Sequence, residues 1–242
     1  MNEIMNAVLK SFNQMIKFWR KDIMLLAVSI APILAGVFFK FGIPFLERLL
    51  TNYFEKESII ADYYSLLDIF YSMLCSVLFC FAAVMVILEE RDEKISNYLL
   101  VTPLKKKGYL WSRLGVSALI AFIITFVLLN VFSLNYMDIF TTFILSIAGT
   151  FQGLIIAMIM LVLSSNKLEA MAVSKMATML MMGAIIPFVI KSNLQYIFFF
   201  LPSFWISKAI MEINNCYLFL AILEALIWFV ILFQKYNKKI VK

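Results

Sequence analysis

Residues 89–115 read EERDEKISNYLLVTPLKKKGYLWSRLG, which is the longest strongly charged stretch in a chain that is otherwise mostly apolar. An apolar run long enough to cross a bilayer flanks it on each side. Within the stretch, apolar residues recur at spacings of three and four, which predicts a short helix with one apolar face. Its face residues are Ile95, Tyr98, Leu99 and Thr102. Pro103 is expected to end this helix, because proline disfavours helical geometry in the residue before it.

This short amphipathic helix lies between two spans and among six cations, so the pattern predicts a docking surface at the cytoplasmic face of a membrane. Two binding partners remain open from the residues alone. One is a groove on a separate protein. The other is an anionic lipid surface, with the lysine side chains reaching to the headgroups. The six cations are Arg91, Lys94, Lys105, Lys106, Lys107 and Arg113.

The composition excludes an ordinary soluble domain. The chain has 242 residues, of which 64% are hydrophobic and 15% are charged, against about 25% charged in soluble domains. Its mean hydropathy is +0.94. We therefore expect an all-α, polytopic membrane protein with one membrane domain. The net charge of +6 does not indicate nucleic acid as a partner, because the cations lie beside apolar runs, where they set topology.

Several kinds of chemistry are excluded by missing residues. The chain contains no histidine, which removes Ser-His-Asp and Cys-His catalysis and every His-ligated metal site. Its three cysteines predict neither a disulfide framework nor a metal site. The phosphate-binding pattern Gly-x-x-x-x-Gly-Lys-Ser/Thr is also missing. We expect a chain that is not an enzyme and binds no cofactor, so that ATP and Mg, if they are used, are bound by a partner.

The apolar runs predict six spans that form a single permease domain over residues 23–234, and the expected spans are 23–41, 66–88, 109–132, 139–163, 168–190 and 214–233. An amphipathic interfacial helix is expected over residues 1–22 and a polar loop over 42–65. Pro202 divides the aromatic segment 191–212 into halves too short to span, which predicts two re-entrant or interfacial helices. A basic cytoplasmic tail covers 235–242.

The distribution of positive charge predicts the orientation of the chain in the membrane. With the N-terminus inside, most of the 21 Lys and Arg residues fall in cytoplasmic segments. This bias favours an even number of spans and places both termini in the cytoplasm of the cell. We expect a multi-pass protein of the plasma membrane.

Three polar residues inside the predicted spans are candidates for the translocation path. Glu224 lies near the middle of the sixth span, where a carboxylate costs about 2.5–3.5 kcal/mol on insertion scales, so it is expected to face protein or water. Gln152 lies at a similar depth in the fourth span, and Asn130 lies near the end of the third. Each has an alternative role as a packing contact or an interhelical hydrogen bond.

The central stretch also carries a family resemblance. Glu89-Glu90 followed by Leu-Leu-Val-Thr-Pro-Leu at residues 99–104 resembles the signature of ABC-2 type transporter permeases. The resemblance implies that residues 89–108 are a coupling segment whose helix lies in a groove of an ATP-binding cassette subunit. It implies that Glu89, Glu90 and Arg91 hold the helix end, that Ile95, Tyr98 and Leu99 insert into the groove, and that Thr102-Pro103 makes the turn.

In that family two copies of an ATPase drive two permease chains, so the resemblance implies a dimer with an identical or related second chain in a bacterial membrane. The function that it implies is ATP-driven export of an apolar or amphipathic substrate, such as a peptide or a drug. Two alternatives stay open. The chain is a membrane scaffold or immunity protein, or it is an ion-coupled carrier that uses Glu224.

Overall fold

A computed structural model of the chain describes residues 22–93, 105–214 and 216–241. Within these ranges every regular element is a helix, and six helical stretches are long and apolar enough to cross a membrane. The predicted all-α architecture with six spans is therefore confirmed. The six stretches are Ile23–Phe54, Ala61–Asp92, Gly108–Phe132, Ile139–Leu163, Lys167–Val189 and Cys216–Lys239.

The first span is longer than predicted. It comprises α2 (Ile23–Val37), a π-helical turn (Phe38–Gly42) and α3 (Ile43–Phe54), so the helix continues through most of the predicted loop 42–65. The loop prediction was wrong because Pro44 and Glu47, which favour a loop in the sequence, have other roles in the folded chain. Pro44 lies in the first turn of α3, where proline is well tolerated. The buried carboxylate of Glu47 accepts hydrogen bonds from the backbone N–H groups of Ile59 (2.9 Å) and Ile60 (2.7 Å).

Two helices form the centre of the molecule. They are α4 (Tyr64–Asp92), which follows a 3-10 turn at Ala61–Tyr63, and α8 (Ile139–Leu163). Buried residues make up 83% of the most apolar stretch of the second span and 78% of that of the fourth, against 17% in the first span. The two helices approach closely, since a Cβ atom added at Gly153 would lie 2.9 Å from the backbone of Ser76.

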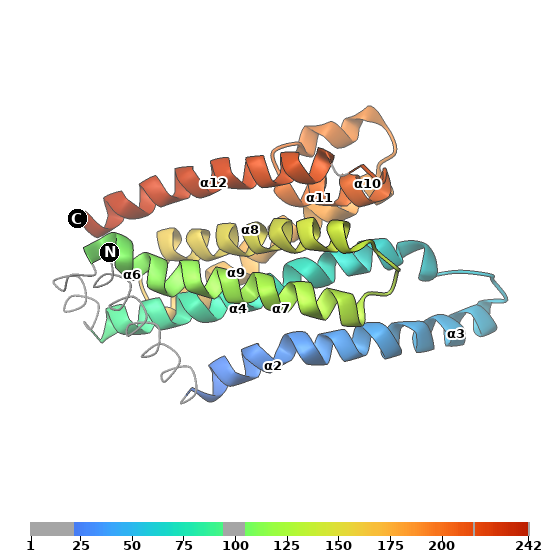
Figure 1. Cartoon of the computed structure of the whole chain (residues 1–242), viewed down its shortest axis with the longest axis horizontal. Coiled ribbons are helices and arrows are strands. Elements are labelled where there is room, and N and C mark those ends of the chain that lie inside the picture. The colour runs from blue at the N-terminus through green and yellow to red at the C-terminus, as the bar shows by residue number, and fades with distance from the viewer. Residues whose placement is uncertain (1–21, 94–104, 215, 242) are drawn as a thin grey trace.

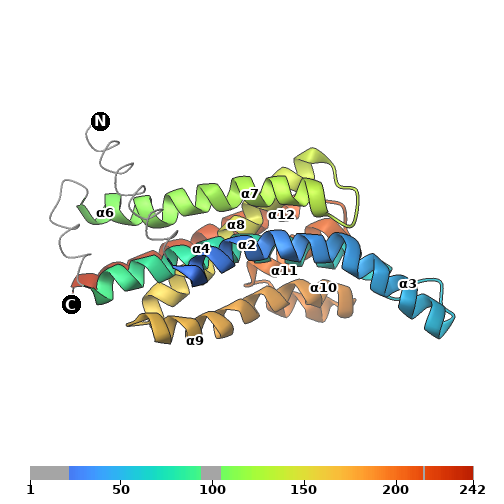
Figure 2. The same ribbon diagram turned by 90° about the horizontal axis from the view of Figure 1, so that it is seen from below.

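Four peripheral helices surround this central pair. Figures 1 and 2 together place α2 and α12 (Cys216–Val241) on opposite sides of it, with α7 (Val116–Phe132) and α9 (Lys167–Thr178) on the two remaining sides. The third span begins before α7, with α6 (Lys105–Leu110) and a π turn at Trp111–Gly115. Hydroxyl groups of α4 and α7 meet inside the bundle, where Ser76 and Thr125 are hydrogen-bonded at 3.0 Å.

The fifth span changes geometry along its length and leads into short helices. After α9 come a 3-10 segment (Met179–Ile185), α10 (Ile186–Val189), a second 3-10 helix (Asn193–Phe198) and α11 (Pro202–Met211). The segment 191–212 thus contains two short helices. α11 is largely buried, and the hydroxyl of Ser203 donates to the carbonyl of Leu180 (2.6 Å) while that of Ser207 donates to the carbonyl of Ala184 (2.5 Å).

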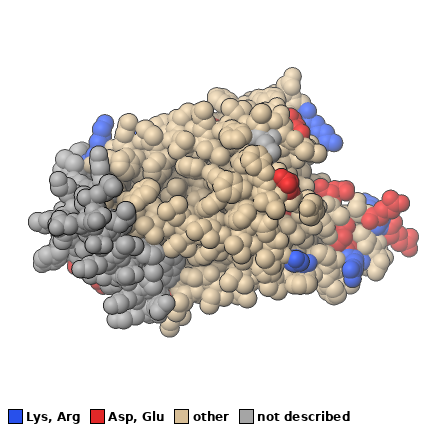
Figure 3. All heavy atoms as spheres, viewed as in Figure 1, with Lys and Arg blue, Asp and Glu red and all other residues tan. Residues whose placement is uncertain are grey.

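We call the end of the molecule where α2 and α9 begin and where α4, α8 and α12 finish the proximal end, and the opposite one the distal end. The face of the molecule seen in Figure 3 has a broad band without charged side chains, and Lys, Arg, Asp and Glu gather at the distal end. Many large apolar side chains of the peripheral helices are exposed. This surface fits a hydrocarbon environment, so the chain is a multi-pass membrane protein.

Candidate coupling site at the proximal end

A buried ionic network joins the second and third spans at the proximal end. The guanidinium group of Arg113 donates from both Nε and Nη2 to the carboxylate of Glu90, with an Nε to Oε2 distance of 3.0 Å. The hydroxyl of Tyr109 donates to the same Oε2 atom at 2.7 Å. The Arg113 side chain is fully buried and that of Glu90 is 3% exposed. A bidentate arginine–carboxylate pair of this kind is among the strongest side-chain interactions.

Local helix geometry helps to form this network. Arg113 lies within the π turn Trp111–Gly115, whose wider winding is frequent at functional sites. Tyr109 lies four residues earlier, and the guanidinium carbon is 5.6 Å from the centre of its ring. Glu90 is in the last turn of α4. The network therefore fixes the two helix ends that flank the segment 94–104.

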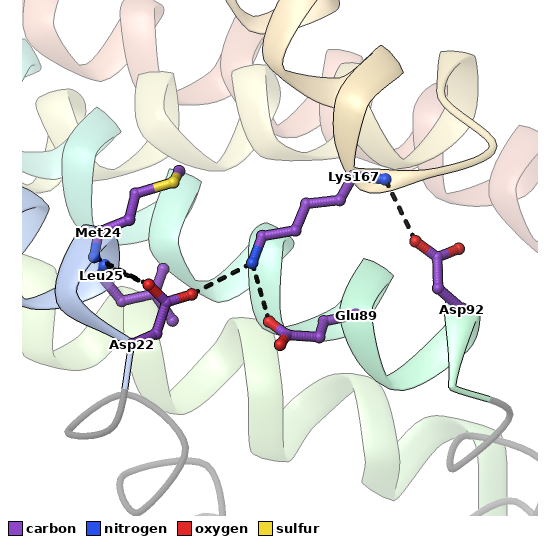
Figure 4. Close-up of polar contacts among 6 residues, drawn as sticks. All are labelled: Asp22, Met24, Leu25, Glu89, Asp92 and Lys167. Carbon is purple, nitrogen blue, oxygen red and sulfur yellow. Dashed lines mark hydrogen bonds and ion pairs between the residues drawn. The ribbon is translucent and has the colours of Figure 1, made fainter.

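A second network at the proximal end is centred on Lys167, the first residue of α9. Its ammonium nitrogen lies 3.1 Å from Oδ2 of Asp22 and 3.0 Å from Oε2 of Glu89, as Figure 4 shows. Asp22 also caps α2, because its Oδ1 accepts the backbone N–H of Met24 at 2.8 Å. Burial raises the pKa of Asp22, but the hydrogen bonds from Lys167 and Met24 outweigh it, so the pKa lies below its ordinary value.

The remaining charges of the last turn of α4 also face neighbouring helices. Asp92 accepts the backbone N–H of Lys167 at 3.4 Å, which places a carboxylate at the N-terminus of α9, where a negative charge is favourable. Arg91 lies within electrostatic range of Lys239 on α12. The ammonium group of Lys239 donates to the carbonyls of Val162 (2.9 Å) and Ser164 (2.6 Å) at the end of α8.

Three of the predicted coupling residues are described, and they lie together at the end of α4. Glu89 and Glu90 belong to the two networks, and Arg91 lies within electrostatic range of α12. The other predicted coupling residues are Ile95, Tyr98, Leu99, Thr102 and Pro103. These five lie outside the described residues, as do residues 1–21 of the expected interfacial helix, so these assignments stay predictions.

Sequence reasoning missed Arg113, Tyr109 and Lys167 as partners of the acidic pair. Arg113 was counted only among the flanking cations of the third span. One signal could have identified it, because an arginine beyond the first turns of an apolar run needs a nearby carboxylate. No comparable signal marks Lys167, which is 78 residues from Glu89 in the sequence. Its place follows only from the packing of α9 beside α4.

The structure separates the three predicted path residues. Asn130 is exposed on α7, and its side-chain amide donates to the carbonyl of Phe126 in the same helix (2.7 Å). Gln152 on α8 is completely buried, and neither of its amide atoms has a partner among the described residues. Glu224 on α12 is half-buried, and its Oε2 atom is likewise enclosed without a partner in the described structure. Within the described part of the chain, neither Asn130 nor Gln152 makes the interhelical hydrogen bond considered for it.

An apolar groove with a volume of about 680 Å³ is lined by residues of the third span, α8 and α12. Thr150, the only polar residue in its lining, donates its hydroxyl to the carbonyl of Ser146 (2.7 Å), so the groove surface is hydrocarbon and aromatic rings. This volume is in the range of pockets that hold drug-sized ligands. The aromatic residues are Trp111, Phe122, Phe143, Phe151, Phe229 and Phe233.

The chain matches the model of a known protein family. The model of a family described as fluoroquinolones export permease protein Rv2686c-like matches residues 15–234, which is nearly the whole chain. No curated protein and no solved structure matched.

Among the described residues, no group of three or more Cys, Asp and Glu side chains is arranged to hold a metal ion.

Proposed function

The chain belongs to the Rv2686c-like family of export permeases, and on that premise we propose that it is the membrane subunit of an ATP-driven exporter of the ABC-2 type. In this proposal the proximal end faces the cytoplasm, and residues 94–104 dock on a separate ATPase subunit that binds ATP and Mg. Two ATPase copies act on a pair of permease chains, identical or related, in a bacterial plasma membrane.

One observation carries the proposal. The docking segment begins and ends at two helices that Glu90 and Arg113 lock together, and this pair is almost completely buried. A force applied to the segment therefore acts on α4 and on the third span as one unit. A short amphipathic helix that only rests on lipid does not need such a rigid base, so the network supports docking on a protein that moves.

The substrate proposed is an apolar or amphipathic compound of drug size. The apolar groove supports this class, because its lining consists almost entirely of aliphatic side chains and aromatic rings. The family description names fluoroquinolones, which makes a fluoroquinolone the first compound to test. Peptides of amphipathic character are the next class, since nothing in the groove distinguishes an aromatic drug from an aromatic side chain.

The test of the proposal is gentle purification of the tagged chain from its native membrane, followed by mass spectrometry of the proteins that accompany it. We expect an ATP-binding cassette protein in stoichiometric amount, and we expect the double variant Tyr98→Asp/Leu99→Asp to lose it. The matched control, Tyr98→Phe/Leu99→Met, keeps the shape and polarity of the face and should retain the ATPase. Purification without any ATPase, or retention by the Asp variant, contradicts the proposal.

An ion-coupled carrier is the second candidate, and the enclosed carboxylate oxygen of Glu224 is the observation that favours it. A carrier of this kind would take up and release a proton at Glu224 during each cycle. Glu224→Gln would then abolish transport and leave any ATPase activity unchanged. The ABC proposal predicts instead that Tyr98→Asp/Leu99→Asp abolishes transport, whereas a carrier would keep it, so transport assays with both variants separate the two candidates.

A further inference from the structure

The side chain of Lys167 links three helices, α2, α4 and α9. Its ammonium group contacts Asp22 at the start of α2 and Glu89 in the last turns of α4, while Lys167 itself begins α9. Among the ion pairs of the described residues, only those of Lys167 link three different spans. The side chains of the three partners are about one quarter exposed, between 25% and 26%, so the contact lies at the rim of the bundle.

The carboxylates around Lys167 would repel one another without its ammonium group. Asp22, Glu89 and Asp92 come from two helices and all face Lys167 or its backbone N–H. Without the ammonium group, the carboxylates of Asp22 and Glu89 would face each other at the rim of the bundle with no cation between them. Like charges repel, so α2 and α9 would lose an attractive link to α4 and gain a repulsive one.

The packing of the two outer helices gives this link importance. The first span has the smallest buried share of the six, 17%, and the fifth has 28%, whereas α4 belongs to the central pair. The outer helices are thus mostly exposed, although α2 also meets α4 deeper in the bundle, where the Tyr71 hydroxyl donates to the carbonyl of Pro32 at 3.1 Å. At the proximal end of the described structure, the hydrogen bonds and ion pairs of Asp22 and Lys167 join α2 and α9 to the last turns of α4.

We infer that Lys167 is a positioning residue for transport, which makes α2 and α9 follow the movement of the α4 end during each cycle. This inference rests on the proposed function, since it assumes that the α4 end is the part that the ATPase displaces. The first, second and fifth spans would then move together, and the third would follow through the separate Glu90–Arg113 pair.

The first measurement tests the link in the permease alone. Ile23 on α2 and Leu168 on α9 are 83% and 78% exposed, so cysteines there can be spin-labelled. Cys216, the exposed native cysteine, is replaced by serine, and the two buried cysteines stay. In lipid nanodiscs we expect one narrow Ile23–Leu168 distance distribution. Lys167→Met should broaden it and lengthen its mean by a few ångströms. Lys167→Arg, which keeps the charge and can pair with two carboxylates, should restore it.

The second measurement is the amount of fluoroquinolone moved per ATP hydrolysed in vesicles that contain the chain and its co-purified ATPase. Lys167→Met should keep ATP hydrolysis but lower this ratio about five- to tenfold, within the range reported for changes in coupling between sites. Lys167→Arg should restore the ratio. The matched control is Lys175→Met, the same change at an exposed lysine on α9 for which the structure gives no ion pair.

The outcomes separate the two ideas. If Lys167→Met leaves both the distance distribution and the transport ratio unchanged, the inference is wrong and the proposed function stands. The same conclusion holds if Lys175→Met has an equal effect or Lys167→Arg fails to restore the ratio. If the wild-type chain shows no ATP-dependent transport, the proposed function fails, while the distance measurement still decides whether Lys167 links α2 and α9. Should Lys167→Met fail to fold, Glu89→Gln removes one arm of the link and gives the same two readouts.

Discussion

The buried Glu90–Arg113 pair gives a sharp prediction about stability. Replacing Glu90 with Gln keeps the size of the side chain but removes the carboxylate charge that pairs with the buried Arg113 guanidinium. Breaking a buried ion pair from one side costs about 3–5 kcal/mol. For chains of this length 1 kcal/mol corresponds to about 2–4 °C in Tm, so the expected loss is roughly 6–20 °C. Thermal unfolding of the purified chain in detergent, followed by circular dichroism, measures it.

The neighbouring residue supplies the control. Glu89→Gln is the same chemical change one position earlier, but the Glu89 side chain is 26% exposed and shares its lysine with Asp22. Partly exposed pairs contribute about 1 kcal/mol or less, so we expect Tm to fall by less than about 4 °C. The triple variant Glu90→Leu/Tyr109→Phe/Arg113→Met removes the whole network and should stay near the wild-type Tm. Equal Tm values for Glu90→Gln and Glu89→Gln would refute this reasoning.

Three further predictions follow from other contacts. Gly153→Ala should lower Tm and reduce the yield of folded protein, because the new Cβ atom would lie 2.9 Å from the backbone of Ser76. Gly115→Ala should lower Tm less, because its nearest neighbour is a side chain that can rotate. Size-exclusion profiles and Tm values of the two variants measure the difference. The pKa of Asp22 is lowered in the folded chain, so its stabilisation is present above its ordinary pKa and lost as the pH falls through the lowered value; Asp22→Asn should therefore flatten the dependence of Tm on pH below about pH 4. Asn130→Ala should leave Tm unchanged, since among the described residues that side chain bonds to its own helix; loss of transport in this variant would support its predicted place in the translocation path.

Hydropathy and charge were sufficient for the number of spans, because a run of about 20 apolar residues has few other uses. The predicted fourth span, 139–163, has the same bounds as α8. The same method predicted that the first span ends at residue 41, whereas the helical stretch continues to Phe54. It read Glu47 as a loop residue, whereas the folded chain buries this carboxylate against two backbone N–H groups. A polar side chain that satisfies distant backbone groups cannot be distinguished in sequence from one that faces water.

The candidate site was predicted in part for a related reason. The acidic pair at residues 89 and 90 was visible as charge beside a span, but its members have different partners, Lys167 for Glu89 and Arg113 for Glu90. Adjacent residues on a helix point in directions about 100° apart, so each reaches a different neighbouring helix. Which neighbour lies on which side depends on the packing order of the spans, and a single sequence does not contain that order.

The close approach of α4 and α8 has a consequence for the route of a solute. Gly149 and Gly153 bring the backbones of these helices together, and their other buried side chains occupy the axis of the chain. A permeating molecule therefore has no passage through the middle of one subunit, as far as the described helices extend. It has to travel along the outer flank of the subunit, where a neighbouring subunit or the lipid supplies the opposite wall. If the proposed pairing of permease chains holds, each copy therefore supplies one wall of the route and not a complete channel.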